Sequence, residues 1–388
     1  MVGNRESRKR GISISGLEIC DPEDLGFSRD RLSRAMRVVC SYTENGSIPG
    51  IEILVIRAGK IALHEACGYA EKIPSSRALV RGMLFDLASL TKPLAGSIVA
   101  GYLVSEGLFH LKQRVSEIIP GFSRTPSGYS EVKDRIKVWM LLSHSSGLPQ
   151  WLPLYRLARN REEVFEETMR VFPSYSPGSG ALYSDLGYIL LTRIAEQVSG
   201  ERFDALFNKV VARKLGLART LYNPLDAGFT GADIVSTEPI EGKPLTGVVH
   251  DENARAMGGV SAHAGLFSTA IEVGRISLEI LSSYRSESDL LLPPAYTRSM
   301  LRRWACGDRC YGLGWWIYDR RAVEAAGDML SRGYGHTGFT GTSVWIDPEL
   351  DLVVVLLTNR IHLGRDNRAI DRLRPVAHNL IMASLKRL

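Results

Sequence analysis

Strand-like runs occupy both ends of this chain, and helix-like segments fill its middle. Near the start, Ile51–Ile56 and Ile61–Tyr69 are rich in apolar and β-branched residues, and Arg57-Ala58-Gly59-Lys60 between them is typical of a hairpin turn. Near the end, Thr340–Ile346 and Leu352–Thr358 have the same character. This pattern predicts an α+β fold, in which one antiparallel sheet is built from N- and C-terminal strands and is flanked by helices.

A mainly helical region is predicted between the two groups of strands. The 388 residues leave room for two domains, and we expect a discontinuous sheet domain at 17–95 and 305–388 with an inserted helical domain at 96–304. The helical domain includes an irregular segment, 220–265, which is punctuated by glycine and proline and is longer than most loops. Residues 1–16 are expected to form a flexible tail. Functional sites commonly form at such domain junctions.

The composition is that of an ordinary globular protein and argues against several function classes. The formal net charge of +6 is not gathered into a basic stripe with aromatic residues, so nucleic-acid binding has no support. The chain lacks both the long apolar run of a membrane span and the apolar segment of a signal peptide, so we expect a cytoplasmic location. A chain trimmed at its start would show the same pattern.

The cysteines favour a reduced compartment. Five cysteines are an odd number in a long chain, which fits reduced thiols better than a disulfide framework. Cys306 and Cys310 are four residues apart and close enough to pair, although nothing in the sequence requires a bond between them.

A Ser-x-x-Lys motif at Ser89 and Lys92 is the first candidate for chemistry. Pro93 indicates that a helix starts here, because proline is tolerated in a first turn, and Leu94–Val104 is predicted to be its buried continuation. A spacing of three places the two side chains on one face. There Lys92, if burial lowers its pKa, can take the proton of a serine nucleophile. The alternative is a helix cap followed by a solvated lysine, so the motif alone is weak.

A second motif, Tyr183-Ser184-Asp185, stands directly before a predicted helix at Leu186–Val198. In the structural interpretation, Ser184 or Asp185 caps that helix and Tyr183 packs in the core. In the functional interpretation, the Tyr183 hydroxyl lies beside Lys92, where a cation lowers the pKa of the phenol and makes it a proton shuttle. Asp185 would then orient Lys92 or the substrate.

A third motif, His336-Thr337-Gly338, leads into a predicted strand. Glycines at a strand start commonly mark a turn or bulge. In a functional interpretation, they let a substrate approach the backbone, whose N–H groups then bind an oxyanion, while His336 and Thr337 contact a carboxylate.

Together the three motifs resemble those of serine β-lactamases and penicillin-binding proteins, which occur in the same order. The chain looks most like the class C β-lactamase branch, which includes family VIII esterases and D-amino-acid peptidases, and the similarity runs from about residue 21 to the C-terminus. Three further segments support it: Leu141–Pro149, Ala264–Thr269 and Val353–Asn359.

The resemblance implies a class C-like fold and a set of roles for the motif residues. Ser89 would be the acylated nucleophile, with Lys92 and Tyr183 as its base system. The N–H groups of Ser89 and Phe339 would form the oxyanion hole, and Asp185, His336, Thr337 and Gly338 would complete the oxyanion and substrate-binding set.

Two departures from the family pattern bear on the substrate. The usual Tyr-x-Asn is Tyr183-x-Asp185 here, which adds a negative charge where a substrate amide is often recognised. The usual Lys-Thr-Gly begins with His336, whose unperturbed pKa is about 6.5. Both changes weaken the case for carboxylate-bearing β-lactams and leave acyl transfer intact. If His336 binds an anion as imidazolium, KM should rise as the pH passes its pKa.

The sequence gives no support to metal or nucleotide chemistry, and no cofactor is expected. His250-Asp251-Glu252 and His263 invite a metal interpretation, but their spacing is not that of a zincin. No Walker, Rossmann or Gly-x-Ser-x-Gly pattern occurs. The resemblance suggests instead that Val249–Gly265 frames the pocket.

We therefore expect a serine hydrolase that cleaves a small ester or amide through an acyl-Ser89 intermediate. The alternatives are a D-Ala-type carboxypeptidase or aminopeptidase, a β-lactamase proper, transfer of the acyl group to an acceptor other than water, and a penicillin-binding-type sensor that acylates without turnover. The expected partner is a small ester, amide or lactam, and the oligomeric state is left open.

Overall fold

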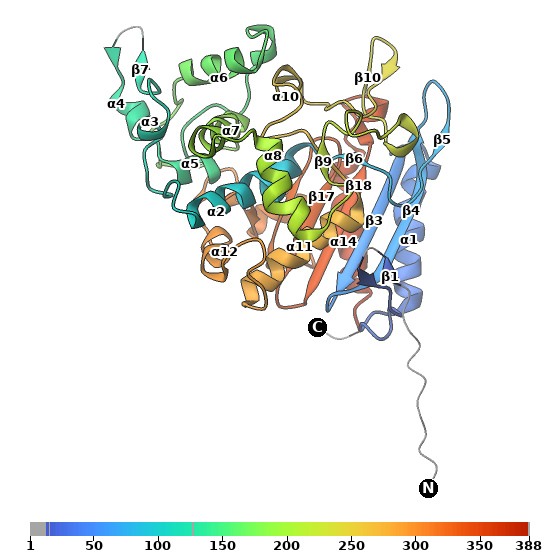
Figure 1. Cartoon of the computed structure of the whole chain (residues 1–388). Coiled ribbons are helices and arrows are strands. Elements are labelled where there is room, and N and C mark those ends of the chain that lie inside the picture. Colours follow the sequence, from blue (N-terminus) through green and yellow to red (C-terminus); the bar gives the residue numbers. More distant parts are fainter. Residues whose placement is uncertain (1–12, 15, 126–127, 387–388) are drawn as a thin grey trace.

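The computed structural model describes residues 13–14, 16–125 and 128–386, and its centre is a nine-stranded sheet (Figure 1). In spatial order its strands are β13 (Ala305–Cys306), β14 (Cys310–Tyr311), β15 (Trp316–Ile317), β16 (Tyr334–Thr337), β17 (Ser343–Asp347), β18 (Leu352–Thr358), β3 (Gly50–Arg57), β4 (Lys60–Glu71) and β5 (Arg77–Ala78). All neighbours are antiparallel, and C-terminal β18 lies beside N-terminal β3 with Val354 opposite Val55. The α+β class and the sheet built from both ends are confirmed.

The predicted hairpin between β3 and β4 is confirmed, together with its turn. Ala58 and Gly59 adopt φ of 51° and 71°, which is the conformation of a turn whose twist matches the flanking strands.

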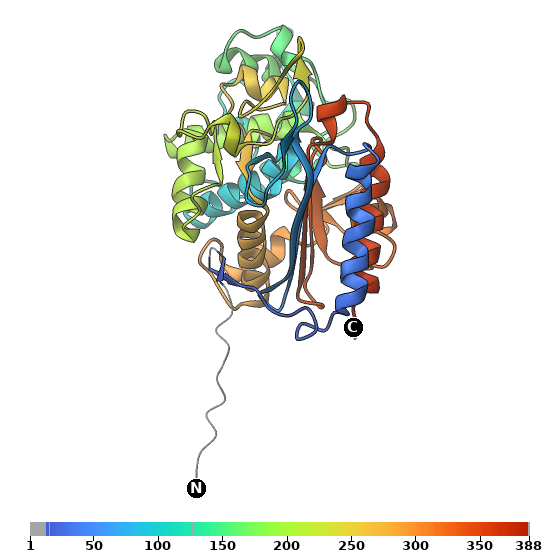
Figure 2. The same cartoon turned by 90° about the vertical axis from the view of Figure 1, so that its right-hand side faces the viewer.

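Helices cover both faces of the sheet. On one face, α1 (Arg29–Glu44) and α14 (Ala369–Ala383) pack side by side (Figure 2). On the other face, α11 (Ala270–Arg285) packs against β3 and β18. Gly274 permits this approach, because a Cβ there would lie 2.8 Å from the side chains of Leu54 and Ile56.

Three helices begin at hydroxyl caps, of which the cap before α7 was expected. The hydroxyls of Ser28, Ser184 and Thr269 accept backbone N–H bonds from the first turns of α1, α7 (Asp185–Ser199) and α11. Helix α14 contains Pro375.

The helical region shares one apolar core with the inner face of the sheet. The same buried cluster includes Leu54 and Val355 from the strands and Leu190 and Phe203 from the helices. The division into two domains stays a prediction, since α11 lies within 96–304 and packs on the sheet. The other helices are α2 (Ser97–Ser105), α3 (Val115–Ile118), α4 (Glu131–Asp134), α5 (Val138–Leu142), α6 (Arg161–Arg170), α8 (Phe203–Phe207), α9 (Arg213–Leu215), α10 (Glu252–Ala256), α12 (Pro294–Met300) and α13 (Val323–Ala326).

Smaller sheets complete the fold. One of them pairs β6 (Phe85–Asp86), β12 (Leu266–Ser268) and β9 (Leu221–Tyr222), and so ties the irregular segment to the nucleophile motif. The two-stranded ones are β1 (Ser13–Ile14) with β2 (Leu17–Glu18), β7 (Arg124–Thr125) with β8 (Gly128–Tyr129), and β10 (Pro239–Ile240) with β11 (Lys243–Pro244). Residues 1–12 of the expected tail lie outside the described residues.

Four of the five cysteines form disulfides, so the expectation of reduced thiols is wrong for them. Cys40 on α1 pairs with Cys67 on β4, and Cys306 pairs with Cys310. The first pair was not foreseen because its residues meet only when α1 packs on the sheet. Cys20 is the free cysteine.

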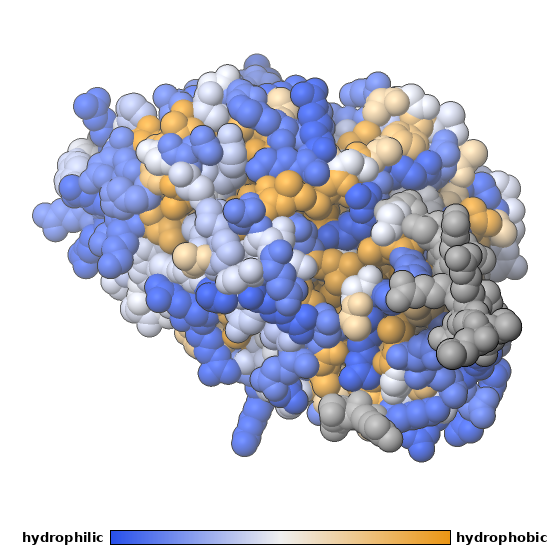
Figure 3. All heavy atoms as spheres, turned by 60° about the horizontal axis from the view of Figure 1, so that its bottom comes forward, coloured by the Kyte–Doolittle hydropathy of each residue, from blue (hydrophilic) through white to orange (hydrophobic). Residues whose placement is uncertain are grey.

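Polar and apolar residues interleave on the face at the bottom of Figure 1, which Figure 3 brings forward. In the part of the chain that the structure describes, no helix has the length and apolar character to cross a membrane.

Candidate active site

Ser89 lies on a short 3₁₀ turn, Ala88–Leu90, that follows β6. The buried carboxylate of Asp86 holds this turn: Oδ1 accepts the N–H of Ala88 at 2.8 Å, and Oδ2 accepts the N–H of His250 at 2.7 Å. Ala88 has φ of 47°, an uncommon value for a residue with a side chain. One carboxylate thus joins the Ser89 turn to the segment around His250.

The chain after β16 packs on the same turn. The hydroxyls of Thr340 and Thr342 donate to the carbonyls of Asp86 and Leu87, at 2.8 and 3.0 Å. Gly338 is required here, because a Cβ would lie 2.1 Å from Thr342 Oγ1 and 2.5 Å from the Leu87 carbonyl. These contacts explain why the strand predicted from Thr340 begins only at Ser343.

Lys92 is fully buried and has three polar neighbours. Its Nζ lies 3.0 Å from Ser89 Oγ, 3.0 Å from the carbonyl of His263 and 2.6 Å from Asp185 Oδ1. Pro93 follows in the first turn of the helix, as expected, although Lys92–Gly96 is a π turn before α2 begins.

Burial lowers the pKa of Lys92, and the carboxylate of Asp185 opposes that shift. Taking an ammonium group out of water penalises its charged form, whereas a nearby anion favours it. The net result is a lysine that loses its proton more readily than one in solvent, which suits it to act as a base.

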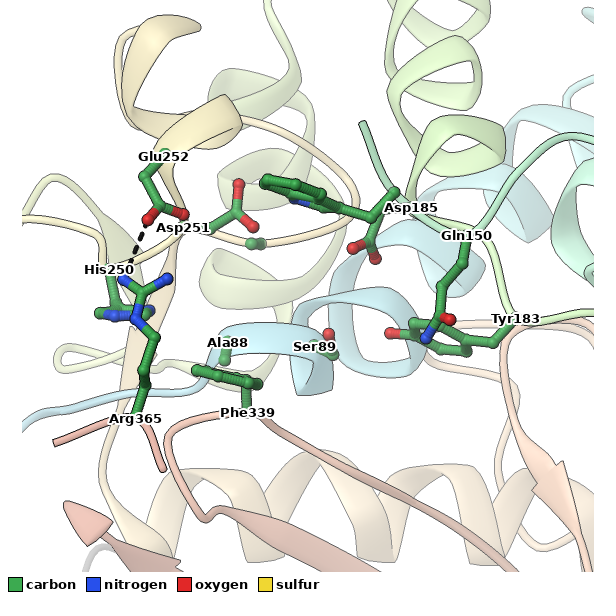
Figure 4. A pocket seen from close by; sticks show the side chains of 12 residues that line it. Ala88, Ser89, Gln150, Tyr183, Asp185, His250, Asp251, Glu252, Phe339 and Arg365 are labelled. Atoms are coloured by element: carbon green, nitrogen blue, oxygen red, sulfur yellow. Dashed lines mark hydrogen bonds and ion pairs between the residues drawn. The ribbon is translucent and has the colours of Figure 1, made fainter. Parts of the chain in front are cut away.

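The Tyr183 hydroxyl points toward Ser89 (Figure 4). Its ring lies beside Lys92, with Nζ 4.8 Å from the ring centroid. The sequence predicted a lowered pKa for this phenol, and that is wrong: burial and then the charge of Asp185 raise the Tyr183 pKa well above its usual value, and the interaction with Ser89 only partly offsets them. Tyr183 is therefore a neutral phenol at rest.

His144 holds the Tyr183 segment in place, a role that the sequence did not reveal. Its Nδ1 accepts the N–H of Ser184 at 3.0 Å, its carbonyl accepts the N–H of Leu182 at 2.9 Å, and its ring stacks on Tyr183. Burial lowers the pKa of His144 well below its usual value, so the ring is neutral with its proton on Nε2. Its φ of 57° marks a tight turn.

We expect His144→Asn to keep most of kcat and His144→Gly to lose it. Both residues tolerate a positive φ, but only asparagine offers an oxygen where Nδ1 accepts the Ser184 N–H. A misplacement of about 1 Å can cost roughly a hundredfold in rate. The kcat of His144→Gly should therefore fall by up to that factor relative to wild type. Steady-state kinetics and thermal unfolding of both variants test this; equal kcat values would contradict it.

The position of His336 does not fit the expected contact with a substrate carboxylate. The side chain is fully buried, and Nδ1 donates to the carbonyl of Thr337 at 2.7 Å. Burial, and then the charge of Lys92, hold the pKa of His336 well below its usual value. A neutral, buried imidazole does not supply the cation that the family's usual lysine would, so we expect no rise of KM through the pKa of His336.

Two hollows flank Ser89. The first is lined by Ala88, Ser89, Gln150, Trp151, Tyr183, Asp185, His250, Asp251, Glu252, Ala264, Phe339 and Arg365 (Figure 4). The second is lined by Ser89, Gln150, Tyr183, Asp308, Arg309, Tyr311, Trp316, Thr337, Gly338, Phe339, Arg360, Ile370, Asp371 and Arg374. The site residues inferred from the sequence therefore lie together around Ser89. His336 lines neither hollow, although its ring centroid lies 5.8 Å from that of Tyr183. The catalytic roles of all these residues stay predictions.

Phe339 lines both hollows and is 48% exposed. Its ring stacks on His250 at 5.6 Å, and His250 bonds Glu238 at 2.8 Å. Arg365 forms ion pairs with Glu238 and Glu252. Phe339, His250, Glu238, Arg365 and Glu252 are thus connected along the side of the first hollow that His250 lines.

The residues that invited a metal interpretation have other partners. His263 Nε2 forms a hydrogen bond with Asp251 at 2.8 Å, and its Nδ1 forms one with Ser261 at 2.7 Å. The backbone carbonyl of His263 accepts the hydrogen bond from Lys92. Among the described residues, no three metal-ligating side chains gather.

Comparisons with known proteins identify the family. The family model described as Beta-lactamase matches residues 35–378. The chain belongs to the beta-lactamase family. This beta-lactamase-family chain is 33% identical over 371 residues to an Escherichia coli K12 protein named "Putative D-alanyl-D-alanine carboxypeptidase", with 88% of this chain and 85% of that protein covered. It is 32% identical over 381 residues to the "N-acetylmuramyl-L-alanine amidase" of Bacillus subtilis 168, with 89% and 84% covered.

Solved structures agree on the fold of this beta-lactamase-family protein. EstCE1, described as a hydrolase with promiscuous acyltransferase activity, matches with a TM-score of 0.71 and 24% identity, over 90% of this chain and 99% of that one. The octameric penicillin-binding protein homologue from Pyrococcus abyssi matches with a TM-score of 0.71 and 19% identity, over 92% and 78%. The resemblance drawn from the three motifs is thus confirmed, and the protein is a serine hydrolase.

Proposed function

We propose that this serine hydrolase cleaves a small carboxylic ester or amide through an acyl intermediate on Ser89. The observation that carries the proposal is the buried Lys92, whose Nζ lies 3.0 Å from Ser89 Oγ and whose pKa is lowered by burial. A serine is a poor nucleophile until a neighbouring base takes its proton. In this site Lys92, which loses its proton more readily than a lysine in solvent, is the base within reach.

The proposed reaction uses the groups that surround Ser89. Ser89 Oγ bonds to the substrate carbonyl carbon while its proton passes to Lys92, and the N–H groups of Ser89 and Phe339 bind the oxyanion. The Tyr183 hydroxyl, still protonated because its pKa is raised by burial, donates a proton to the leaving group, and Lys92 restores it. Water then attacks the acyl carbon by the same route, releasing the acid and regenerating Ser89.

A D-Ala-type carboxypeptidase is the second candidate. Its leaving group carries a carboxylate, and three arginines, Arg309, Arg360 and Arg374, are among the residues that line the second hollow beside Ser89. The printed name of the Escherichia coli relative points the same way. An aminopeptidase, a β-lactamase and an acyl transferase share the same first step and differ in the acyl or leaving group.

A progress curve separates these possibilities from a sensor that acylates once. We expect p-nitrophenyl acetate to give a burst followed by a steady release of p-nitrophenol, because water can reach the acyl carbon from two open hollows. A burst that stops at one equivalent of Ser89 would support the sensor. Nitrocefin and a D-Ala-D-Ala peptide, assayed alongside, rank the lactamase and peptidase alternatives.

The cellular location of the reaction stays a prediction. The sequence favoured the cytoplasm, whereas the disulfides Cys40–Cys67 and Cys306–Cys310 are typical of an oxidising compartment.

A further inference from the structure

Lys92 carries its amine on a flexible four-carbon side chain, so the amine needs partners that fix its direction. The neutral amine, which is the form that accepts a proton, has two N–H bonds and one lone pair. The carbonyl of His263 and the carboxylate of Asp185, 3.0 and 2.6 Å from Nζ, can accept the two N–H bonds. The lone pair is then left for the hydroxyl of Ser89, whose Oγ lies 3.0 Å from Nζ. The position of the His263 carbonyl therefore affects whether Lys92 can act as the base.

His263 lies in a buried stretch, 260–265, that has no regular secondary structure. The residues before it are held by α7, because the hydroxyl of Thr192 accepts the N–H of Ala262 at 2.8 Å. The same hydroxyl bonds that of Ser261 at 3.1 Å. In the part of the chain that the structure describes, the other hydrogen bonds of His263 are made by its side chain. The direction of its carbonyl thus depends on how that side chain is held.

Asp251 holds the imidazole of His263. Nε2 lies 2.8 Å from Asp251 Oδ1, and Nδ1 lies 2.7 Å from the hydroxyl of Ser261. Because an ionised carboxylate can only accept, Nε2 donates in this pair. The side chain of His263 is 1% exposed and that of Asp251 is 20% exposed, so water competes little for the bond between them.

The carboxylate of Asp251 is itself fixed at the start of α10. Its Oδ1 also accepts the N–H of Ala254 at 2.7 Å, which is the N-cap bond of that helix. Burial would raise the pKa of the Asp251 carboxyl, but the interactions with His263 and with the N–H of Ala254 outweigh burial and hold that pKa below its usual value. Asp251 is therefore an ionised acceptor at neutral pH.

The residue before Asp251 ties the same segment to the nucleophile (Figure 4). The N–H of His250 donates to Asp86 Oδ2 at 2.7 Å, while Oδ1 of that carboxylate holds the turn of Ser89. His250 and Asp251 thus connect one short piece of chain to the Ser89 turn and, through His263, to the partner of Lys92.

We propose that Asp251 and His263 are positioning residues, which aim a backbone carbonyl at the Lys92 amine and so direct its lone pair at the nucleophile. The inference rests on the proposed function of Ser89. Neither side chain has to touch the substrate for this role. The histidine and aspartate that invited a metal interpretation would thus support acyl transfer instead.

The pair is tested by the rate of acylation, measured as the burst of p-nitrophenol from p-nitrophenyl acetate. In His263→Ala and Asp251→Ala the carbonyl loses its anchor, and a shift of about 1 Å can cost roughly a hundredfold in rate. The burst rate should fall toward that factor relative to wild type. Asp251→Asn and His263→Gln keep a hydrogen bond between the two positions and should stay within a few-fold of wild type. Alanine variants as fast as wild type, or conservative variants as slow as the alanine ones, overturn the proposal.

A second buried pair of an imidazole and a carboxylate provides the matched control. His64 Nε2 on β4 lies 2.8 Å from Glu52 Oε1 on β3, and neither residue lines a hollow beside Ser89. His64→Ala should lower Tm, as His263→Ala does, because each leaves a buried carboxylate without its partner. Its burst rate should equal that of wild type. An equal loss of burst rate in both variants would mean general destabilisation and would overturn the positioning role.

The pH profile gives a readout that a purely structural role would not move. The titratable groups around the Lys92 amine are Asp185, Asp251, Tyr183, Tyr188, His144 and His336. Burial lowers the pKa of Lys92, and the charges of Asp185 and then Asp251 raise it. Asp251→Asn should therefore move the rising limb of kcat/KM to lower pH and keep its plateau, whereas His64→Ala should leave the limb in place. An unmoved limb in Asp251→Asn overturns the assignment.

A crystal structure of His263→Ala decides the geometry without any turnover. Lys92 Nζ should leave its place 3.0 Å from Ser89 Oγ, and an amine in the wild-type place overturns the positioning role. Asp251→Ala gives the same comparison if His263→Ala does not fold. If wild type neither hydrolyses p-nitrophenyl acetate nor is acylated by it, the proposed function fails, and these structures still decide the role of the pair.

Discussion

Replacing Ser89 by alanine is expected to abolish turnover of every substrate together with covalent labelling. In the proposed mechanism Ser89 Oγ is the atom that forms the acyl bond, and no other group of the site is expected to replace it. Loss of a nucleophile that works as a unit with its base typically costs about 10⁴-fold or more in kcat. The measurements are p-nitrophenyl acetate hydrolysis and the mass of the protein after treatment with a fluorophosphonate.

A second serine provides the matched control for this variant. Ser179 is exposed and its hydroxyl bonds only the nearby carbonyl of Ser176, so Ser179→Ala should keep full activity and labelling. Residual labelling of Ser89→Ala on another serine would show that the acyl-enzyme forms elsewhere, and the proposed mechanism would then be wrong.

Lys92→Met should lower kcat/KM by about a hundredfold to ten-thousandfold, the usual contribution of a positioned general base. Methionine fills a similar volume but cannot accept the Ser89 proton. In wild type, kcat/KM should rise with pH through the pKa of Lys92, because only the neutral amine accepts a proton, and burial places that rise below the usual range of a lysine. The rise should be absent from the residual activity of Lys92→Met.

Asp185→Asn gives this assignment an independent readout. The carboxylate lies 2.6 Å from Lys92 Nζ and raises the lysine's pKa, so its removal should lower that pKa further. The rising limb of the pH profile should therefore move to lower pH. A limb that stays in place would mean that another group titrates there. Thermal unfolding of both variants shows whether the fold is kept.

The sheet and the helix after Tyr183 were predictable because they depend on local patterns, whereas the convergence of the motifs was implied by the family resemblance. Apolar, β-branched runs identify β3 and β18, and the Ser184 hydroxyl cap identifies α7. The motifs around Ser89, Tyr183 and Thr337 were found because their chemistry depends on residue type and spacing.

What the sequence could not show depends on packing across the chain. His336 looks like a ligand-binding residue until the structure places Trp316 and Tyr183 against it, which leaves it buried and neutral. His144 lies in a segment already noticed, but its acceptor role needs the position of Ser184. The sequence showed that Cys306 and Cys310 are close enough to pair. That the loop between them lies beside Ser89 could not be predicted, because it depends on the order of strands in the sheet.

The pairing of β18 with β3 also affects how the protein is made. On the ribosome, β3 emerges early and must wait for almost the entire chain before Val354 can lie opposite Val55. Contacts between such distant segments form slowly, and a waiting strand edge is prone to wrong partners. The Ser89 turn, which needs Thr340 and Thr342 to hold it, therefore matures only once translation is nearly complete, so an unfinished nascent chain cannot hydrolyse anything.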